Sequence, residues 1–274
     1  MKYAKQIGFD ILINTNGFFD ITPILDYSDE FVFSLHGYKS INDDITRMKN
    51  TFTRVENNIK LATNKNKPVL INTVLIEENF DNYLKLLEYL ESRYNNLKYS
   101  PTIAIESKTG KQMFKGLNIN KENMGKYEKI LDEIGEEKII YKHGLRGLRK
   151  ADNKKEFDMP VCAAGKSKLI IKYNGNVYPC NFFQTNDFLC GNVFEENVKE
   201  IWEKGKGFKI FRDYYLKRNL PHKCQECNKV NNCFSGCRAW TQSYINGEMN
   251  IISERDVRCE FINAFTGIGD NNEM

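Results

Sequence analysis

Four of the eight cysteines fall in one short stretch, residues 224–237, with the spacing C-x2-C-x5-C-x3-C. This stretch constrains the fold most, because dense thiolates bind metal and soft sulfur ligands select zinc, copper(I) or iron–sulfur clusters. A close C-x2-C pair presents two thiolates to one inorganic centre. The other four cysteines are Cys162, Cys180, Cys190 and Cys259, and none precedes Cys162. The sequence therefore divides into a first part without cysteine and a second part expected to bind metal.

Composition narrows the class of protein. The chain has 274 residues, 41% of them hydrophobic, which suffices for one large domain or for a domain plus a smaller one. Its net charge is only +4 and no basic run occurs, so neither nucleic acid nor a membrane is the expected partner. No apolar run reaches the roughly 18 residues of a transmembrane helix, and the N-terminus does not resemble a signal peptide. We expect a cytoplasmic protein, whose cysteines bind metal rather than form disulfides.

Strand and helix patterns alternate in the first half of the chain. A helix is expected to end at Gly8, apolar runs predict strands at 9–14, 30–35, 69–76 and 100–105, and amphipathic periodicity predicts helices at 46–63, 80–90 and 120–134. This alternation implies an α/β fold with parallel strands, whose ligands bind at the carboxyl ends of the strands. The residues expected there are Thr15, Asn16, Gly17, Ser34, Leu35, His36, Gly37, Asn72 and Thr73.

The pattern changes from about residue 151. Two short strands, 168–172 and 176–179, flank Asn174-Gly175, a strong hairpin signal, and Cys180 follows directly. Helices are expected at 198–202 and 207–217. The hairpin thus places a thiolate at a defined position.

The order of the cysteines resembles a known family. This order is similar to that of the seven-cysteine SPASM domain of radical S-adenosylmethionine (radical SAM) enzymes. It begins with Cys162, continues with Gly175-x4-Cys180 and the C-x2-C-x5-C-x3-C stretch, and ends with Cys259. The resemblance covers residues 162–259 and includes the segment LCGNVFEENVKEIW. It implies a small cysteine-rich iron–sulfur domain.

The first half resembles the later part of the radical SAM barrel, a partial (β/α)6 structure. GFDILINTNG is similar to its third strand and EFVFSLHG to its fourth. By this resemblance Thr15 and Asn16 line the SAM pocket, Ser34 approaches the methionine carboxylate and Arg47 pairs with it. The planar guanidinium group of an arginine can donate two parallel hydrogen bonds to one carboxylate, and a hydroxyl group adds a further directed hydrogen bond. An isolated Ser or Arg in an α/β protein is also commonly structural, and the sequence leaves both readings open.

One departure from the family pattern limits the expected activity. The chain contains no C-x3-C-x2-C motif, which in radical SAM enzymes binds the cluster that cleaves SAM. We therefore expect an α/β barrel lacking its first two strands, N-terminally truncated and unable to cleave SAM alone. The strand at 9–14 is then expected to form an open edge, which is an aggregation liability. The expected domains are 1–150 for the barrel part and 151–266 for SPASM, with a flexible tail at 267–274.

The SPASM resemblance divides the cysteines between two auxiliary [4Fe–4S] clusters. It assigns Cys162, Cys180 and Cys237 to the first cluster, and Cys224, Cys227, Cys233 and Cys259 to the second. Cys190 stands where the family usually has an apolar residue, so it is either a small core residue or a further ligand. Zinc at two four-cysteine sites is the competing interpretation.

Other titratable residues carry weaker signals. His36 follows a strand that leads to the expected pocket, and a structural or exposed role competes with catalysis there. His143 and His222 are expected to be structural. Asp187 follows the Cys180 hairpin, but no catalytic pair of carboxylates can be recognised from sequence.

The resemblance implies the C-terminal portion of a radical SAM/SPASM enzyme that oxidatively modifies a peptide or protein, of the sulfatase-maturase or thioether-forming type. The expected cofactors are the two auxiliary clusters, with SAM only if the missing N-terminal part is supplied. The expected partners are a peptide or protein substrate and an electron donor such as a ferredoxin or flavodoxin. The alternatives are a non-catalytic iron–sulfur or electron-transfer module and a zinc-stabilised interaction domain.

Overall fold

The computed structural model describes residues 1–104, 117–140, 162–214, 216, 219–227, 230–240, 255–256 and 258–259. They belong to two compact units, the first up to residue 140 and the second from residue 162. The predicted boundary near residue 150, the predicted tail and His143 lie outside the described residues. None of the helices in the described ranges is long and apolar enough to cross a membrane.

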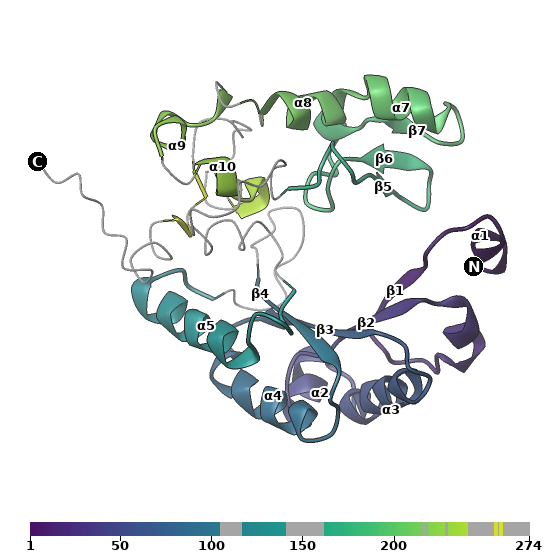
Figure 1. Ribbon diagram of the computed structural model, residues 1–274, viewed down its shortest axis with the longest axis vertical. Coiled ribbons are helices and arrows are strands. Elements are labelled where there is room, and N and C mark those ends of the chain that lie inside the picture. The colour runs from purple at the N-terminus through teal and green to yellow at the C-terminus, as the bar shows by residue number, and fades with distance from the viewer. Residues whose placement is uncertain are drawn as a thin grey trace, which may run out of the picture. The chain divides into compact units, whose positions relative to one another are not determined.

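The first unit contains a four-stranded parallel sheet with helices on one side (Figure 1). The strands lie in the order β1 (Leu12–Thr15), β2 (Glu30–Ser34), β3 (Val69–Leu75) and β4 (Leu97–Ile103). The helices are α1 (Lys2–Gln6), α2 (Ser40–Thr46), α3 (Thr51–Asn64), α4 (Tyr83–Glu91) and α5 (Lys121–Ile134), with short 3-10 turns η1 (Thr22–Tyr27) and η2 (Phe80–Asn82). The α/β fold with parallel strands, expected from the alternation, is confirmed.

The core of this unit lies between the sheet and its helices. Phe31 and Phe33 of β2 alternate with residues of the other face and have no exposed surface. On α3, Val55 and Ile59 are equally buried, one turn apart. This is the helical spacing that brings side chains onto one face, so the apolar stripe of α3 covers the aromatic side of the sheet.

Some predicted bounds were wrong. The helix expected at 46–63 begins only at Thr51, because Arg47 and Asn50 adopt left-handed backbone angles, φ 57° and 63°, that interrupt a helix. Met48 is accordingly 45% exposed rather than part of the buried stripe. The first strand begins at Leu12 rather than at residue 9, and the fourth runs from Leu97 to Ile103 rather than over 100–105.

The second unit combines a small antiparallel sheet with short helices. Its strands are β5 (Ile170–Ile171), β6 (Asn176–Tyr178) and β7 (Gly191–Asn192), and its helices are α7 (Val198–Lys204), α8 (Lys206–Tyr214), α9 (His222–Gln225) and α10 (Val230–Cys233), with a 3-10 turn η3 (Asn186–Phe188). The predicted hairpin is confirmed: β5 and β6 pair around a turn in which Gly175 takes φ +84°, an angle that favours glycine. The helix expected at 207–217 ends at Tyr214.

Candidate functional site

Four cysteines of the second unit line one small cavity. Cys224 lies in α9, Cys227 follows that helix, Cys233 ends α10 and Cys259 comes from a segment far along the chain. The cavity measures about 30 Å³, and Arg255 is also in its wall. The two short helices thus present three thiols to a space that the distant Cys259 closes.

These four thiols influence one another electrostatically. Burial, together with the neighbouring Cys259, Cys224 and Cys227, raises the pKa of Cys233 to about 12. Burial likewise raises the pKa of Cys224 and of Cys259, with added effects from the other cysteines of the cavity. A thiolate in this space is costly unless a cation offsets its charge. An iron–sulfur cluster or a metal ion would supply that positive charge and displace the thiol protons.

The donor set fits an all-cysteine cluster, although the cavity is small. Among the residues that the structure describes, no group of three or more His, Cys, Asp or Glu side chains is arranged to hold a metal ion. The four thiols surround a space instead, with room for about one or two water molecules. The cysteine side chains must therefore move apart to admit an iron–sulfur cluster. Binding of the cluster is then coupled to a change in the structure around the cavity.

A second group contains Cys162, Cys180 and Cys237. All three pack against the same hydrophobic cluster, whose buried members include Phe183 and Phe211. Burial raises the pKa of Cys180 and that of Cys237, and in both cases Cys162 raises it further. The pKa of Cys237 reaches about 12. Three cysteines that are distant in sequence are therefore close in space, as the SPASM resemblance implies.

Cys190 lies in a different environment. Its side chain is 8% exposed and packs with Val177, Ile201 and Phe208 in a hydrophobic cluster of its own. Its thiol donates a hydrogen bond to the Phe188 carbonyl at 3.4 Å. Burial raises its pKa to about 11. Of the two interpretations of Cys190, this environment favours the core residue.

The residues expected to contact SAM lie at strand and helix ends of the first unit. Thr15 and Ser34 are the last residues of β1 and β2, and Asn16 follows Thr15. Thr15 Oγ1 accepts a hydrogen bond from the Gly17 amide at 3.0 Å, which shapes the turn. Arg47 directly follows α2, in a left-handed backbone conformation. The carboxyl ends of β1 and β2 therefore carry the predicted residues.

A row of polar side chains crosses the sheet from Ser34 through Asn72 to Ser100, and of these three residues sequence reasoning missed only Ser100. In the parallel register Ser34 pairs with Asn72, and Asn72 pairs with Ser100. Residues in register point to the same side, and Ser34 alternates with Phe33, so this row faces away from α3. Ser100 is fully buried, and within the described part of the chain neither its hydroxyl nor that of Thr102 has a hydrogen-bond partner. The sequence signal that could have identified this row is that each of these otherwise apolar strands contains a polar residue.

His36 has a structural role in this arrangement. Its Nδ1 accepts a hydrogen bond from the Val74 amide at 3.2 Å, and its backbone groups bond to the side chains of Asn42 and Asn79. Burial lowers its pKa below the ordinary value of 6.5. The imidazole is therefore neutral and ties the end of β2 to β3.

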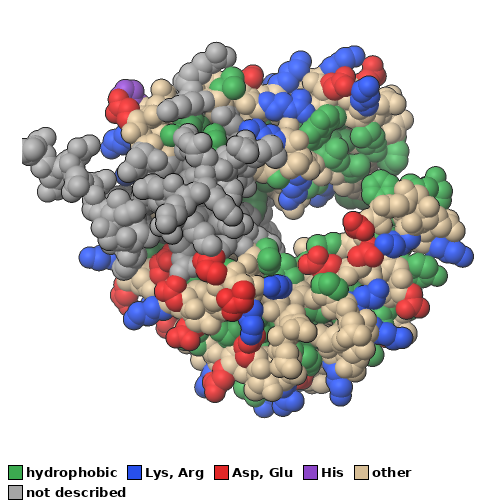
Figure 2. Space-filling model, viewed as in Figure 1, with side chains coloured by type: hydrophobic (Ala, Val, Ile, Leu, Met, Phe, Trp, Pro, Cys, Tyr) green, Lys and Arg blue, Asp and Glu red, His purple; other side chains and the backbone are tan. Residues whose placement is uncertain are grey.

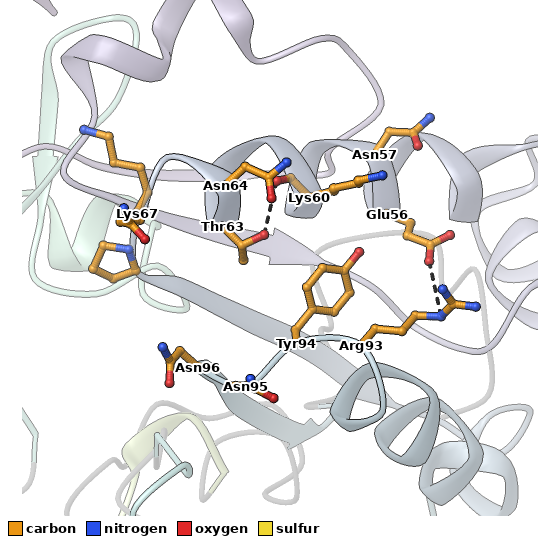
Figure 3. A pocket seen from close by; sticks show the side chains of 12 residues that line it. Glu56, Asn57, Lys60, Thr63, Asn64, Lys67, Arg93, Tyr94, Asn95 and Asn96 are labelled. Carbon is orange, nitrogen blue, oxygen red and sulfur yellow. Dashed lines mark hydrogen bonds and ion pairs between the residues drawn. The ribbon is translucent and has the colours of Figure 1, made fainter.

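A broad polar pocket of about 920 Å³ lies at the other ends of these strands (Figure 3). It is lined from α3 by Lys60 and Glu56 and, next to the starts of β3 and β4, by Lys67 and Asn96. Glu56 forms an ion pair with Arg93 at 3.9 Å. The pocket contains none of the predicted site residues, and the candidate SAM site lies at the carboxyl ends instead.

Known proteins resemble this chain in sequence and in fold. Residues 162–228 match the SPASM family, an iron–sulfur cluster-binding domain. The AdoMet-dependent heme synthase of Methanosarcina barkeri is 24% identical over 264 residues, which cover 87% of this chain and 72% of that protein. The cysteine-type anaerobic sulfatase-maturating enzyme of Clostridium perfringens is 23% identical over 84 residues, 31% of this chain and 22% of that enzyme.

A solved structure extends the likeness to nearly the whole chain. The structure of "Native anSMEcpe with bound AdoMet" superposes with a TM-score of 0.71 at 18% identity, covering 97% of this chain and 75% of the other. This likeness extends over both units, whereas the family match is confined to the cysteine-rich part. The resemblance inferred from the cysteine spacing is thus confirmed, and the chain has the fold of radical SAM enzymes that carry a SPASM domain.

Proposed function

We propose that this chain acts in a radical SAM enzyme that oxidatively modifies a peptide or protein and binds two auxiliary [4Fe–4S] clusters. The observation that carries the proposal is that Cys224, Cys227, Cys233 and Cys259 line one cavity, whereas the other three cysteines are not in its lining and pack together against a hydrophobic cluster that also includes Cys224. Cys224, Cys227, Cys233 and Cys259 would hold one cluster, and Cys162, Cys180 and Cys237 the other. Such clusters, when bound, accept and release single electrons.

The chain's own residues would hold SAM at the carboxyl ends of β1 and β2. Thr15, Asn16 and Ser34 supply hydroxyl and amide groups there, and Arg47 supplies a cation for the methionine carboxylate. Within the described residues the buried hydroxyl of Ser100, on the same sheet face as Ser34, has no hydrogen-bond partner, which supports a polar ligand because buried polar groups are normally hydrogen-bonded. Because the chain has no C-x3-C-x2-C motif, binding of SAM rather than its cleavage is expected of this polypeptide alone.

Anaerobic reconstitution with iron and sulfide tests the cofactors. We expect about eight irons and eight sulfides per chain, four of each for every cluster. Zinc without sulfide would favour the zinc-stabilised domain and overturn the proposal.

Calorimetric titration with SAM tests the binding site. Ser34→Ala and Arg47→Ala are each expected to weaken binding about tenfold or more, in line with the loss of a hydrogen bond to a charged group. Ser92→Ala removes an exposed hydroxyl at the end of α4 and serves as the control. If reconstituted protein holds clusters but no SAM, the chain is an electron-transfer module rather than part of the catalytic barrel.

The class of substrate separates two candidate functions. The sulfatase-maturating relative acts, by its name, on a protein, and this favours a peptide or protein substrate. The match to a heme synthase covers more of this chain and favours a tetrapyrrole as the second candidate. Titrating the reconstituted protein with a cysteine-containing peptide and with an iron porphyrin distinguishes them. Saturable binding of the porphyrin alone would overturn the peptide assignment.

A further inference from the structure

A buried ion pair joins Asp256, which lines the four-cysteine cavity, to Arg258. The carboxylate of Asp256 accepts two hydrogen bonds from the Arg258 guanidinium, from Nε at 3.0 Å and from the terminal nitrogen at 2.7 Å. Their side chains are 0% and 3% exposed, and the guanidinium lies 4.8 Å from the centre of the Trp240 ring. Burying such a pair costs desolvation energy that its attraction often fails to recover. Stability alone is therefore a weak reason for its presence.

Asp256 contacts both groups of cysteines. It lines the cavity together with Cys224, Cys227, Cys233 and Cys259, and its backbone carbonyl accepts a hydrogen bond from the Cys259 amide at 3.0 Å. The same residue reaches the other group, because its Oδ2 accepts a hydrogen bond from the Cys237 amide at 2.9 Å. One carboxylate thus lies between the two proposed cluster sites.

The backbone before Cys237 is shaped for this contact. Gly236 has φ +73°, an angle that favours glycine, and a Cβ placed there would lie 2.5 Å from both Cβ and Oδ2 of Asp256. The Asp256 amide in turn donates to the Ser235 carbonyl at 3.3 Å. The segment between Cys233 and Cys237 therefore wraps closely around the carboxylate, and only glycine permits that approach.

We propose that Asp256 and Arg258 form a positioning pair that links the two cysteine groups and sets the reduction potentials of both clusters. The proposal rests on the function proposed above. A carboxylate next to a cluster opposes the arrival of an electron, and a guanidinium favours it. Charge and hydrogen bonding around the ligands are the means by which a protein tunes such potentials. Because one pair is shared, a change in either residue is expected to affect both clusters.

Redox titration followed by electron paramagnetic resonance tests this pair in the reconstituted protein. Asp256→Asn keeps the size of the side chain and removes its charge, and it should shift both potentials to more positive values. Arg258→Gln should shift both to more negative values. In the double variant Asp256→Asn/Arg258→Gln, both reduction potentials should return toward the wild-type values. Cys180→Ala and Cys233→Ala, each reconstituted alone, assign the two signals.

The exposed ion pair between Glu200 and Lys204, at 3.2 Å, offers a matched control. Glu200→Gln removes the same kind of charge outside the cysteine groups and should leave both potentials unchanged. Should Asp256→Asn fail to fold, Arg258→Gln and Arg258→Lys carry the test. Lys keeps the charge and should retain potentials close to the wild type, whereas Gln should not.

Two results would overturn the positioning role. If neither potential moves in a variant that retains its iron, the pair is purely structural. If only one cluster responds, Asp256 does not link the two groups. Failure of the wild-type chain to bind iron and sulfide would instead overturn the proposed function, so the two failures are distinguishable.

Discussion

At the scale of single residues, His36 shows how burial converts a titratable group into a structural one. The unprotonated Nδ1 of His36 accepts a hydrogen bond from the Val74 amide, and burial lowers the pKa of the imidazole below 6.5. As the pH falls, the unfolded chain therefore takes up a proton before the folded chain does. The contribution of His36 to the free energy of unfolding is therefore fully present above about pH 6.5, and it is lost as the pH falls through the lowered pKa of the folded state.

We predict that His36→Asn removes this part of the pH dependence. The Asn amide oxygen can accept the Val74 hydrogen bond and does not titrate. Thermal unfolding measured between about pH 5 and about pH 7.5 should show a smaller loss of stability at low pH than in the wild type. His222→Asn changes an exposed histidine and should retain the wild-type slope. An unchanged slope in His36→Asn would contradict this role.

At the scale of elements, the side chain of Asp43 in α2 caps the start of α3. Its carboxylate accepts hydrogen bonds from the backbone amides of Asn50 and Phe52, at 2.6 and 2.9 Å, and from the Thr51 hydroxyl at 2.6 Å. These amides belong to the first turn of α3, where backbone donors have no partner within the helix. A residue of one helix therefore caps the next.

We predict that Asp43→Ala lowers the free energy of unfolding by about 1–2 kcal/mol, the usual cost of losing a helix cap. Asp43→Asn keeps an acceptor oxygen and should lose less. Asp44, which is exposed on the same helix, provides the control in Asp44→Ala. Equal stability of Asp43→Ala and Asp44→Ala in urea unfolding would show that the cap contributes little.

The strand β1 lies at one edge of the parallel sheet and, in the described residues, pairs only with β2. Among the described strands, β1 therefore has the edge position predicted for it. Apolar side chains are exposed near it: Leu12 by 52%, Phe9 by 60% and Ile7 by 53%. Figure 2 shows uncovered hydrophobic side chains over α1, which precedes this strand. Open apolar edges favour association between chains.

We predict that Leu12→Lys reduces aggregation. Leu12 stands opposite Glu30 in the parallel register, so a lysine there gains a partner of opposite charge. Light scattering during a concentration series should show a later onset than in the wild type. Leu84→Lys adds the same charge at an exposed position of α4 and should have a smaller effect. Equal effects of the two variants would indicate a general charge effect rather than edge pairing.

Periodicity in the sequence predicted the alternating elements because buried strands and amphipathic helices need apolar residues at regular spacing. It did not predict the break before α3, because the left-handed angles of Arg47 and Asn50 leave no hydrophobic signal. Asp256 was also missed. Its contacts with Gly236 and Cys237 join segments far apart in sequence, and no pattern marks a buried carboxylate.

At the scale of the whole molecule, the first unit carries one candidate site and the second carries two. The parallel sheet presents Thr15, Ser34 and the Asn72–Ser100 pair, and the cysteine-rich unit presents the two groups of thiols. The cysteine groups were predictable, because their spacing is specific to one family of domains. The polar row was less so, since single polar residues within strands are common in α/β proteins.

The central claim is that seven cysteines divide into two independent cluster sites. Iron and sulfide counts on two double variants test it directly, with Cys190→Ala as a control that should lose no iron. Cys224→Ala/Cys233→Ala should lose no more than Cys233→Ala alone, about half of the total, because both residues belong to one site. Cys180→Ala/Cys233→Ala should lose nearly all of the iron. Complete loss in the first double variant, or retention of half in the second, would contradict the division.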